Sequence, residues 1–464
     1  MLRASKMTRL ARTRTIRLSD GFYLREEALR ILFISYYFPP YNIIASLRVG
    51  KTAKYLRQFG HEVRIVTARN LPYPADLPFE VPSEHVIATP WVDVSMPHTL
   101  ATRLRRHRSG VVALFDKAPA GQMQYTIALR LLDAYRALVA FPDDAIGWFP
   151  FGWNAAQRLL KRWRPDVLVA SSGPPTSLLI ANALHQQYNL PWVGELRDLW
   201  TDNHYYSYPM WRRVLETWLE RRTLRTAAGL VTVSEPLAHA LRLRYNLPTE
   251  VVLNGFDPAD YPPMRPTRAD PQLTIVYTGT IYRINQRAAP LFAALQRLGA
   301  RAARVRVTVY SHSISGIVAI RSEAQQYGVE HLLDVRDAVP HREALAQQRA
   351  ADVLLLLLWN DPRERGVYTG KLFEYLGARR PILGIGPADN VAADLIRERR
   401  AGMVSADPVE IAGQLTRWLD AKECGGIPDL PASASAGLSR EEQTRRLERF
   451  LGQVIDRYNI SSDT

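Results

Sequence analysis

A short segment in the second half of the chain combines a helix start with a lysine and a glutamate. Thr369-Gly370-Lys371 stands where a loop should enter a helix, which continues as KLFEYLGA. Free backbone N–H groups and the positive end of the helix dipole favour an anion there, and Lys371 adds a mobile positive charge. Glu374 lies one turn further on the same face, where a carboxylate could accept hydrogen bonds from ribose hydroxyls. The segment favours a diphosphate site; the alternative is a surface helix with a Lys371–Glu374 salt bridge.

Several other chemistries lack their residues. A P-loop needs glycines five positions apart and a hydroxyl after the lysine, whereas Gly366 and Gly370 are four apart and Leu372 follows. The chain has no His-Glu-x-x-His, no zinc-spaced Cys/His set and no Asp-x-Asp pair. Ala170-Ser-Ser-Gly173 lacks the elbow of a serine hydrolase, and Gly384-Ile-Gly386 is half a dinucleotide fingerprint. We therefore expect neither a metal site nor a cofactor.

Composition narrows the partners and the compartment. The chain has 464 residues, and its 60 Lys+Arg against 45 Asp+Glu give a net charge of +15, which suits partners that carry phosphate. The single cysteine, Cys424, excludes an internal disulfide and is typical of a reducing compartment, so a cytoplasmic location is expected. No run reaches the roughly 20 apolar residues of a spanning helix. Residues 1–29 form a basic leader that we expect to be disordered.

These candidate residues need a scaffold, and the first half of the chain predicts a parallel sheet. ILFISYYFPP (31–40) and EVRIVTA (62–68) read as buried strands around a helix over 46–59, which makes a βαβ unit. Residues 71–119 do not continue this alternation of strands and helices, and we interpret them as an insertion that leaves the sheet. Further strands are expected over 166–172, 191–198, 229–234 and 250–257, with helices over 124–139, 153–163 and 176–188.

The second half restarts the same pattern after a Pro- and Asp-rich linker at 257–272. Strands are expected over 273–279, 305–311, 332–337, 352–359 and 380–386. The prediction is an α/β protein with two doubly wound, Rossmann-like domains, residues 30–256 and 273–438, that face each other across a ligand-binding cleft. Residues 439–464 are expected to form a helix that packs back on the first domain.

The segment GVYTGKLFEYLGARRPILGI (366–385) resembles the donor-binding signature of retaining glycosyltransferases of family 4, which have the GT-B fold. FPPYNIIASLRVGKTAKYLRQFGHEVRIVTA is similar to the first βαβ unit of that family. LVASSGPPTSLLIANALHQQYNLPWVGELRDLW resembles the acceptor domain of the branch that acts on polysaccharide or lipid-linked acceptors. VVLNGFD and IVYTGTIY resemble the strands that flank the linker. The resemblance covers about residues 31–417.

For the second domain, the resemblance implies a nucleotide-sugar donor as co-substrate. Lys371 would neutralise the diphosphate of the leaving group, and Glu374 would hold the ribose. The remaining donor-side residues implied by the resemblance are Gly279, Thr280, Val339, Thr369 and Gly370, with Arg283 or Arg287 as a second cation. The implied reaction is metal-independent and retains the anomeric configuration by front-face substitution.

For the first domain, the resemblance implies an acceptor site. Arg197 and Asp198 would line the cleft and take part in catalysis; the alternative is an Arg–Asp pair that orders the end of a strand. The acceptor-side residues are expected to include Pro39, Pro40, Arg48 and Glu195. The acceptor would be a glycan or a polyprenyl-diphosphate-linked sugar in cell-surface polysaccharide biosynthesis.

The chain also departs from the pattern of the family. The family motif has two glutamates eight positions apart, but Gly366 occupies the partner position of Glu374. Glu364 lies out of register and is interpreted as a solvated charge. A glycine-rich loop after the first strand is missing, because Tyr41-Asn-Ile-Ile44 follows Pro40. The replacement of the first glutamate by Gly366 puts the usual contact to the donor sugar in doubt.

The basic cluster 103–108 lies in the insertion 71–119, and Phe115, Met123 and Tyr125 follow it in the sequence. This combination suggests contact with an anionic membrane. A peripheral position on the inner face of the membrane is one expectation; a solvated loop is the other.

Two further readings of the chain stay open. A non-hydrolysing nucleotide-sugar epimerase would share the fold and the donor, although the chain lacks its cluster of carboxylates and histidine. A catalytically degenerate binder would explain Gly366. Nucleic acid is not expected as a partner, because the arginines are scattered without interleaved aromatic residues.

Overall fold

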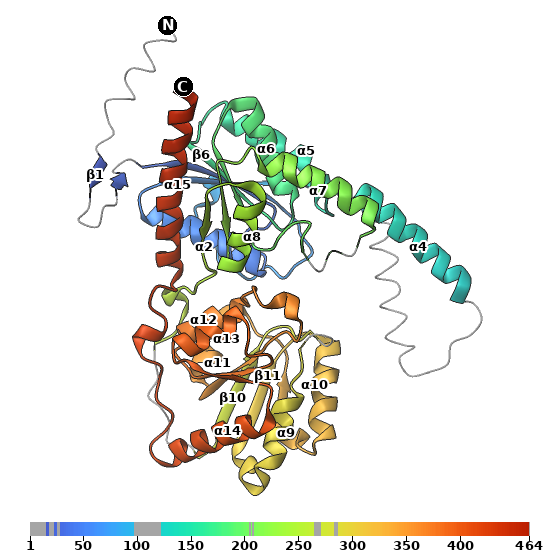
Figure 1. The fold of residues 1–464 in the computed structure, drawn as a ribbon, viewed down its shortest axis with the longest axis vertical. Helices are drawn as coiled ribbons and strands as arrows, with labels where there is room; N and C mark the ends of the chain where they lie inside the picture. Colours follow the sequence, from blue (N-terminus) through green and yellow to red (C-terminus); the bar gives the residue numbers. More distant parts are fainter. Residues whose placement is uncertain are drawn as a thin grey trace. The chain divides into compact units, whose positions relative to one another are not determined.

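The computed structural model describes residues 15–17, 23–25, 28–96, 122–203, 206, 208–263, 271–282 and 286–463. The chain divides into two compact units, each built on a parallel sheet flanked by helices (Figure 1). The predicted α/β class with two Rossmann-like units is confirmed. The N-terminal unit comprises Met1–Thr232, Leu237–Val251 and Arg445–Thr464, and the C-terminal unit Val233–Pro236 and Val252–Thr444.

The sheet of the N-terminal unit has seven strands in the order β5-β4-β3-β6-β7-β8-β9, and all neighbouring pairs are parallel. Its strands are β3 (Arg30–Ser35), β4 (Glu62–Ala68), β5 (Val86–Thr89), β6 (Val167–Ser171), β7 (Trp192–Glu195), β8 (Gly229–Thr232) and β9 (Thr249–Val251). The interpretation of 71–119 as an insertion that leaves the sheet is wrong for residues 86–89, because these form β5 at the edge of the sheet. Only one of these four side chains is buried, so the strand carries a weak apolar signal.

Helices cover this sheet and fill its core. They are α2 (Ile44–Gln58), α4 (Gln122–Val139), α5 (Phe149–Leu160), α6 (Thr176–Tyr188), α7 (Met210–Leu224), α8 (Glu235–Tyr245) and α15 (Arg440–Asp463). Trp148 and Trp192 are fully buried in the main cluster. From Arg445 on, α15 belongs to this unit, where Phe450 and Val454 lie against Gly229.

The sheet of the C-terminal unit has six parallel strands in the order β12-β11-β10-β13-β14-β15. The strands are β10 (Leu273–Thr278), β11 (Val305–Tyr310), β12 (Leu333–Arg336), β13 (Val353–Leu357), β14 (Ile382–Ile385) and β15 (Gly402–Ser405). Strand β15 was not expected from the sequence. The helices are α9 (Ala289–Arg297), α10 (Ile314–Gln326), α11 (His341–Ala350), α12 (Gly370–Ala378), α13 (Val391–Glu398) and α14 (Pro408–Glu423).

Alternate residues of the central strands of this sheet pack in two separate hydrophobic clusters. Leu355 packs in the cluster with α9 and α14, whereas Leu354 and Leu356 pack in the cluster with α12 and α13. A strand that is buried on both faces explains the continuous apolar run of β13.

The leader contains a short structured element. Strands β1 (Thr15–Arg17) and β2 (Tyr23–Arg25) pair antiparallel, so the expectation of a disordered leader is wrong for these six residues. Isoleucine, leucine, tyrosine and threonine make them competent to pair as strands.

The order of the strands reverses once in each unit. The reversal lies between β3 and β6 in the N-terminal unit and between β10 and β13 in the C-terminal unit. In open α/β sheets, ligands bind at the carboxyl ends of the strands at such a point.

Candidate functional site

At the carboxyl end of β10, a glycine and the predicted lysine lie against each other. Gly279 has φ +109°, a conformation that side chains disfavour. A methyl group built on Gly279 would lie 2.8 Å from Cε and 3.3 Å from Nζ of Lys371. Lys371 is the second residue of α12, and its Nζ lies 5.3 Å from the centre of the Tyr277 ring. The structure thus brings two of the predicted donor-side residues together, 92 positions apart in the sequence.

The lysine is held in a partly dry position. Burial lowers the pKa of Lys371 below its ordinary value, although the negative charge of Glu374 opposes the shift. A cation with reduced hydration attracts an anion more strongly than one in bulk water. The position therefore suits a phosphate that would restore the lost solvation.

Glu374 is fixed by two side chains of α11. Nε2 of His341 lies 3.1 Å from Oε1, and Nε2 of Gln348 donates to Oε2 at 3.0 Å. The same Gln348 nitrogen donates to Oγ1 of Thr278 at 2.9 Å, which ties α11 to the end of β10. These contacts hold the carboxylate in place beside Lys371.

The protonation state of Glu374 follows from these contacts. Burial alone would favour the neutral acid, but the hydrogen bonds from His341 and Gln348 hold the pKa of Glu374 below its usual range. A carboxylate accepts but cannot donate, so Nε2 of His341 carries the proton in this contact. Among the described residues, no ion pair joins Lys371 to Glu374, which disfavours the alternative of a simple surface salt bridge.

The remaining donor-side residues are distributed around this pair. The backbone oxygen of Thr280 accepts a hydrogen bond of 2.6 Å from the hydroxyl of Tyr277, and Thr369 caps α12 without a side-chain bond. Val339 packs against the core near α12. Arg287 pairs with Glu323 at 2.7 Å, and Arg283 lies outside the described residues.

Sequence reasoning missed a pair of aromatic residues, one of which interacts with the lysine. Tyr282 follows β10 and Trp359 follows β13, and their ring centres are 5.1 Å apart. Tyr282 is half exposed and contributes to the electrostatic environment of Lys371. The signal available in the sequence was an aromatic residue just after each of two buried strands.

One interpretation from the sequence is wrong. Glu364 was expected to be a solvated charge, but its side chain is buried at 8% exposure. It ends a short 3-10 helix, Pro362–Glu364, in which it is buried. Gly366 follows two residues later, at the position where the family places a glutamate.

In the N-terminal unit, the predicted Arg48 and Glu195 form a buried ion pair. Nε of Arg48 lies 2.8 Å from Oε1 of Glu195, and the hydroxyl of Ser171 donates to the other carboxylate oxygen at 2.6 Å. Burial opposes ionisation, but Arg48 holds the pKa of Glu195 below its usual range. Both side chains are almost fully enclosed, so an acceptor role for them stays a prediction.

Arg197 and Asp198 separate at the end of β7. Arg197 donates to the backbone oxygens of Ser172 at 2.7 Å and of Gly173 at 3.3 Å. Asp198 is exposed, and its negative charge acts on the guanidinium of Arg197, so both interpretations of this pair stay predictions. Pro39 and Pro40 follow β3 at the same edge of the sheet, joined by a cis peptide bond.

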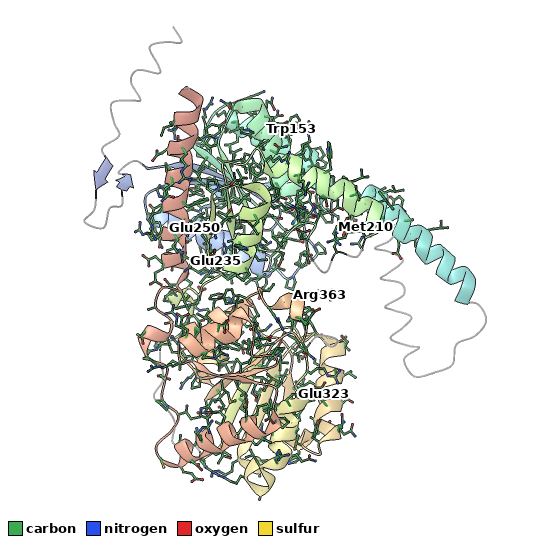
Figure 2. The ribbon with its side chains drawn as sticks, in the orientation of Figure 1. Trp153, Met210, Glu235, Glu250, Glu323 and Arg363 are labelled. Atoms are coloured by element: carbon green, nitrogen blue, oxygen red, sulfur yellow. The ribbon has the colours of Figure 1, made fainter. Side chains whose placement is uncertain are left out.

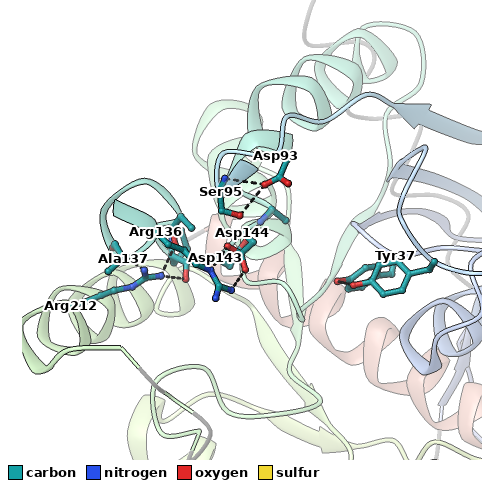
Figure 3. Close-up of polar contacts among 12 residues, drawn as sticks. Tyr37, Asp93, Ser95, Arg136, Ala137, Asp143, Asp144 and Arg212 are labelled. Atoms are coloured by element: carbon teal, nitrogen blue, oxygen red, sulfur yellow. Dashed lines mark hydrogen bonds and ion pairs between the residues drawn. The ribbon is translucent and has the colours of Figure 1, made fainter. Parts of the chain in front are cut away.

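A buried carboxyl near this edge was not anticipated. Asp143 accepts hydrogen bonds from the backbone N–H and the hydroxyl of Thr176, at 2.7 and 2.8 Å, and from the N–H of Ala145. Burial raises the pKa of Asp143 to about 6. Figure 3 shows Asp143 and Asp144 in one polar cluster with Arg136 and Arg212. The bonds to Thr176 give Asp143 a structural role at the start of α6.

The two parallel sheets, each with one reversal of strand order, define the GT-B fold. Sucrose-phosphate synthase from Thermosynechococcus elongatus is similar at a TM-score of 0.60 and 13% identity, covering 92% of this chain and 99% of that one. HepE of Anabaena, solved with UDP and glucose, gives 0.57 and 14%, covering 92% and 100%. WaaG, a glycosyltransferase involved in lipopolysaccharide biosynthesis, gives 0.50 and 13%, covering 92% and 98%.

The family model for Glycosyltransferase Family 4 matches residues 98–260. The resemblance to family 4 stated from the sequence is confirmed over this segment, which lies in the N-terminal unit and the start of the next. No curated protein sequence matches the chain.

Proposed function

We propose that the chain is a glycosyltransferase that moves a sugar from a nucleoside-diphosphate donor to a glycan or lipid-linked acceptor. The observation that carries this proposal is the contact of Lys371 with Gly279, beside the fixed carboxylate of Glu374. The family 4 match supports the same class of reaction, and HepE was solved with UDP and glucose.

In this proposal, each donor-side residue has a separate task. The diphosphate lies at the start of α12, where Lys371 and the free N–H groups neutralise it, and Gly279 lets the backbone approach. Glu374 accepts hydrogen bonds from the ribose hydroxyls, with His341 and Gln348 keeping it ionised and oriented. The Tyr282–Trp359 pair offers an apolar face next to the diphosphate.

The reaction that fits these groups is a metal-independent, retaining transfer. The bond between the anomeric carbon and the phosphate oxygen breaks, and the acceptor oxygen bonds to the same carbon from the same face. The acceptor proton passes to the departing phosphate, whose charge Lys371 stabilises. Full loss of activity in a chelator, restored by magnesium, would contradict a metal-independent reaction.

The acceptor belongs to the N-terminal unit in this proposal. Arg197 and Asp198 follow β7 at the ligand-binding edge of the sheet, and the exposed Asp198 is available to an acceptor hydroxyl. WaaG is involved in lipopolysaccharide biosynthesis, which supports an acceptor in cell-surface polysaccharide assembly.

A product assay with nucleotide sugars tests the reaction class. Release of free nucleoside diphosphate that depends on an added acceptor would support a transferase. Conversion of the donor into a sugar isomer would identify an epimerase, and donor binding without turnover a degenerate binder; either result would overturn the proposal.

Replacing Lys371 tests the donor site. We expect Lys371→Ala to weaken UDP binding by roughly ten- to a hundredfold, because a charge-assisted contact to phosphate is worth about 1.5–3 kcal/mol. Lys371→Arg, which keeps the charge, should retain more of the affinity. Isothermal titration with UDP measures both.

The matched control for this pair is Lys161→Ala, which removes a lysine from the N-terminal unit. Unchanged UDP affinity in Lys371→Ala, with native stability in all three proteins, would remove Lys371 from the donor site.

A further inference from the structure

Helix α7 has its polar side turned inward. Arg212, Glu216 and Glu220 follow each other at intervals of four and are each at most 1% exposed. A helix on the surface of a soluble protein usually does the reverse and buries its apolar side chains. The buried polar contacts of α7 therefore determine which side of the helix faces outward.

The buried charges of α7 are satisfied by fixed partners. Arg212 donates to the backbone oxygens of Ala137 at 2.9 Å and Pro142 at 2.9 Å, and its Nε to Glu216 at 2.5 Å. Figure 3 shows the Arg212 side chain reaching toward Ala137. Glu220 accepts a hydrogen bond of 2.6 Å from the hydroxyl of Tyr245. These contacts fix which face of α7 points outward.

The outer face of α7 is apolar over two to three turns. Its side chains are between 46% and 70% exposed; they are Met210, Trp211, Val214, Leu215 and Trp218. Figure 2 labels Met210 at the end of α7 that adjoins α4. Two exposed tryptophans and three aliphatic side chains on one helix form a patch that water does not favour.

Helix α4 carries a second set of exposed apolar side chains. Leu131, Tyr135 and Leu138 are exposed and recur at intervals of four and three, which places them on one side of α4. The bond from Arg212 to Ala137 joins the two helices. Asp133 is two positions from Leu131 and so points away from this stripe. We call the eight exposed apolar residues of α7 and α4 the apolar face.

The exposed charged residues of α7 have one sign. Both acidic residues of α7, Glu216 and Glu220, are buried, whereas Arg221, Arg222 and Arg225 are exposed at its C-terminal end. The guanidinium of Arg222 lies 5.5 Å from the centre of the Trp218 ring. Tryptophan beside arginine is the combination that lies at a bilayer interface, with the ring among the headgroups and the cation on a phosphate.

We propose that the apolar face docks on a bilayer that contains anionic phospholipid, with the three arginines on the headgroup phosphates. A second copy of the chain would meet the arginines with the same arginines and no exposed acid of α7, so charge complementarity favours lipid. No helix in the described part of the chain is long and apolar enough to cross a membrane. The proposal is independent of the donor site.

The sequence located its candidate membrane contact elsewhere. The cluster 103–108 and Phe115 lie outside the described residues, and so do the side chains of Met123 and Tyr125. The apolar face was missed because its residues follow ordinary helical spacing, and only burial shows which side of α7 faces the core.

Vesicle co-sedimentation of the full chain tests the proposal. The probes are vesicles of phosphatidylcholine alone and of phosphatidylcholine mixed with phosphatidylglycerol. We expect the wild type to sediment with the mixed vesicles, and the double variant Trp211→Ser/Trp218→Ser to bind them about tenfold or more weakly. Arg221→Gln/Arg222→Gln should reduce the preference for the anionic vesicles.

The matched control is Ile314→Ser/Val318→Ser on α10, which removes two similarly exposed apolar side chains from the C-terminal unit. It should bind vesicles like the wild type, and circular dichroism should show that all variants are folded. Equal binding by wild type and the tryptophan variant, or no binding by the wild type, would overturn the proposal. So would a dimer in light scattering that the tryptophan variant abolishes, because the apolar face would then be a protein contact.

Discussion

At the residue scale, one lysine carries most of the proposed chemistry, and its environment gives it a pH signature. Lys371 is charged only below its pKa, and burial places that pKa below the ordinary lysine value. The charge is therefore lost as the pH rises through the lowered pKa, earlier than for an exposed lysine.

The lowered pKa of Lys371 leads to a prediction for UDP affinity at alkaline pH. We expect wild-type affinity to fall between neutral pH and the ordinary lysine pKa of about 10.4, whereas Lys371→Arg should stay level because arginine remains charged. Titration calorimetry across this range measures both proteins. A parallel decline in the two would assign the pH dependence to another group.

At the same scale, the sequence predicted Lys371 and Glu374 but not what holds them. Gln348 and His341 are 26 and 33 positions away from Glu374, and no motif connects them. Glu364 was misread because burial depends on how a loop folds, which local polarity does not reveal.

At the scale of elements, the strands and helices follow largely from the apolar runs. Strand β4 has the predicted bounds, and β10 and β11 each end one residue before the prediction. Strands β5 and β15 were missed because each has four residues, of which only one is buried. Hydrogen bonds to the neighbouring strand stabilise β5 and β15, whose own sequences carry little apolar signal.

The polar anchor of α7 leads to a prediction about stability. Arg212→Met should destabilise the N-terminal unit by about 3–5 kcal/mol, because it leaves Glu216 without its buried cation and frees carbonyls on the α4 side. Denaturant unfolding, followed by hydrogen exchange in β6 to β8, measures the loss.

Arg213→Met is the matched control on the same helix. Arg213 is partly exposed and lies 4.0 Å from Asp202, so its removal should cost less than about 1 kcal/mol. Similar losses in both variants would mean that the buried contacts of Arg212 do not anchor α7.

At the scale of the whole molecule, the chain leaves the N-terminal unit at residue 251 and returns to it at 445. The last helix, α15, packs on that unit. Phe450 contacts Gly229, Oε1 of Glu448 lies 2.8 Å from Nε2 of His61, and the hydroxyl of Tyr458 donates to Oδ1 of Asn189 at 2.7 Å. The stability of the N-terminal sheet therefore depends on residues that follow the entire C-terminal unit.

Phe450→Ala tests this closure. We expect a loss of about 3–5 kcal/mol in the N-terminal unit, since a buried ring leaves a cavity against β8. Hydrogen exchange should rise in β7 and β8, while UDP affinity and exchange in β10 to β13 stay unchanged.

Phe79→Ala provides the comparison, because Phe79 is half exposed and should tolerate truncation within about 0.5 kcal/mol. An equal rise of exchange in the C-terminal sheet of the Phe450 variant would show that α15 supports both units rather than one.

The sequence by itself determined the α/β class, the two series of strands and helices, and the lysine-tipped helix start. These features depend on apolar periodicity and on residues that are close in the chain. The tertiary structure decided that Gly279 meets Lys371, that α11 orients Glu374, and that α7 turns its tryptophans outward. Each of these contacts joins distant segments or selects one side of a helix, and packing of the complete chain sets both.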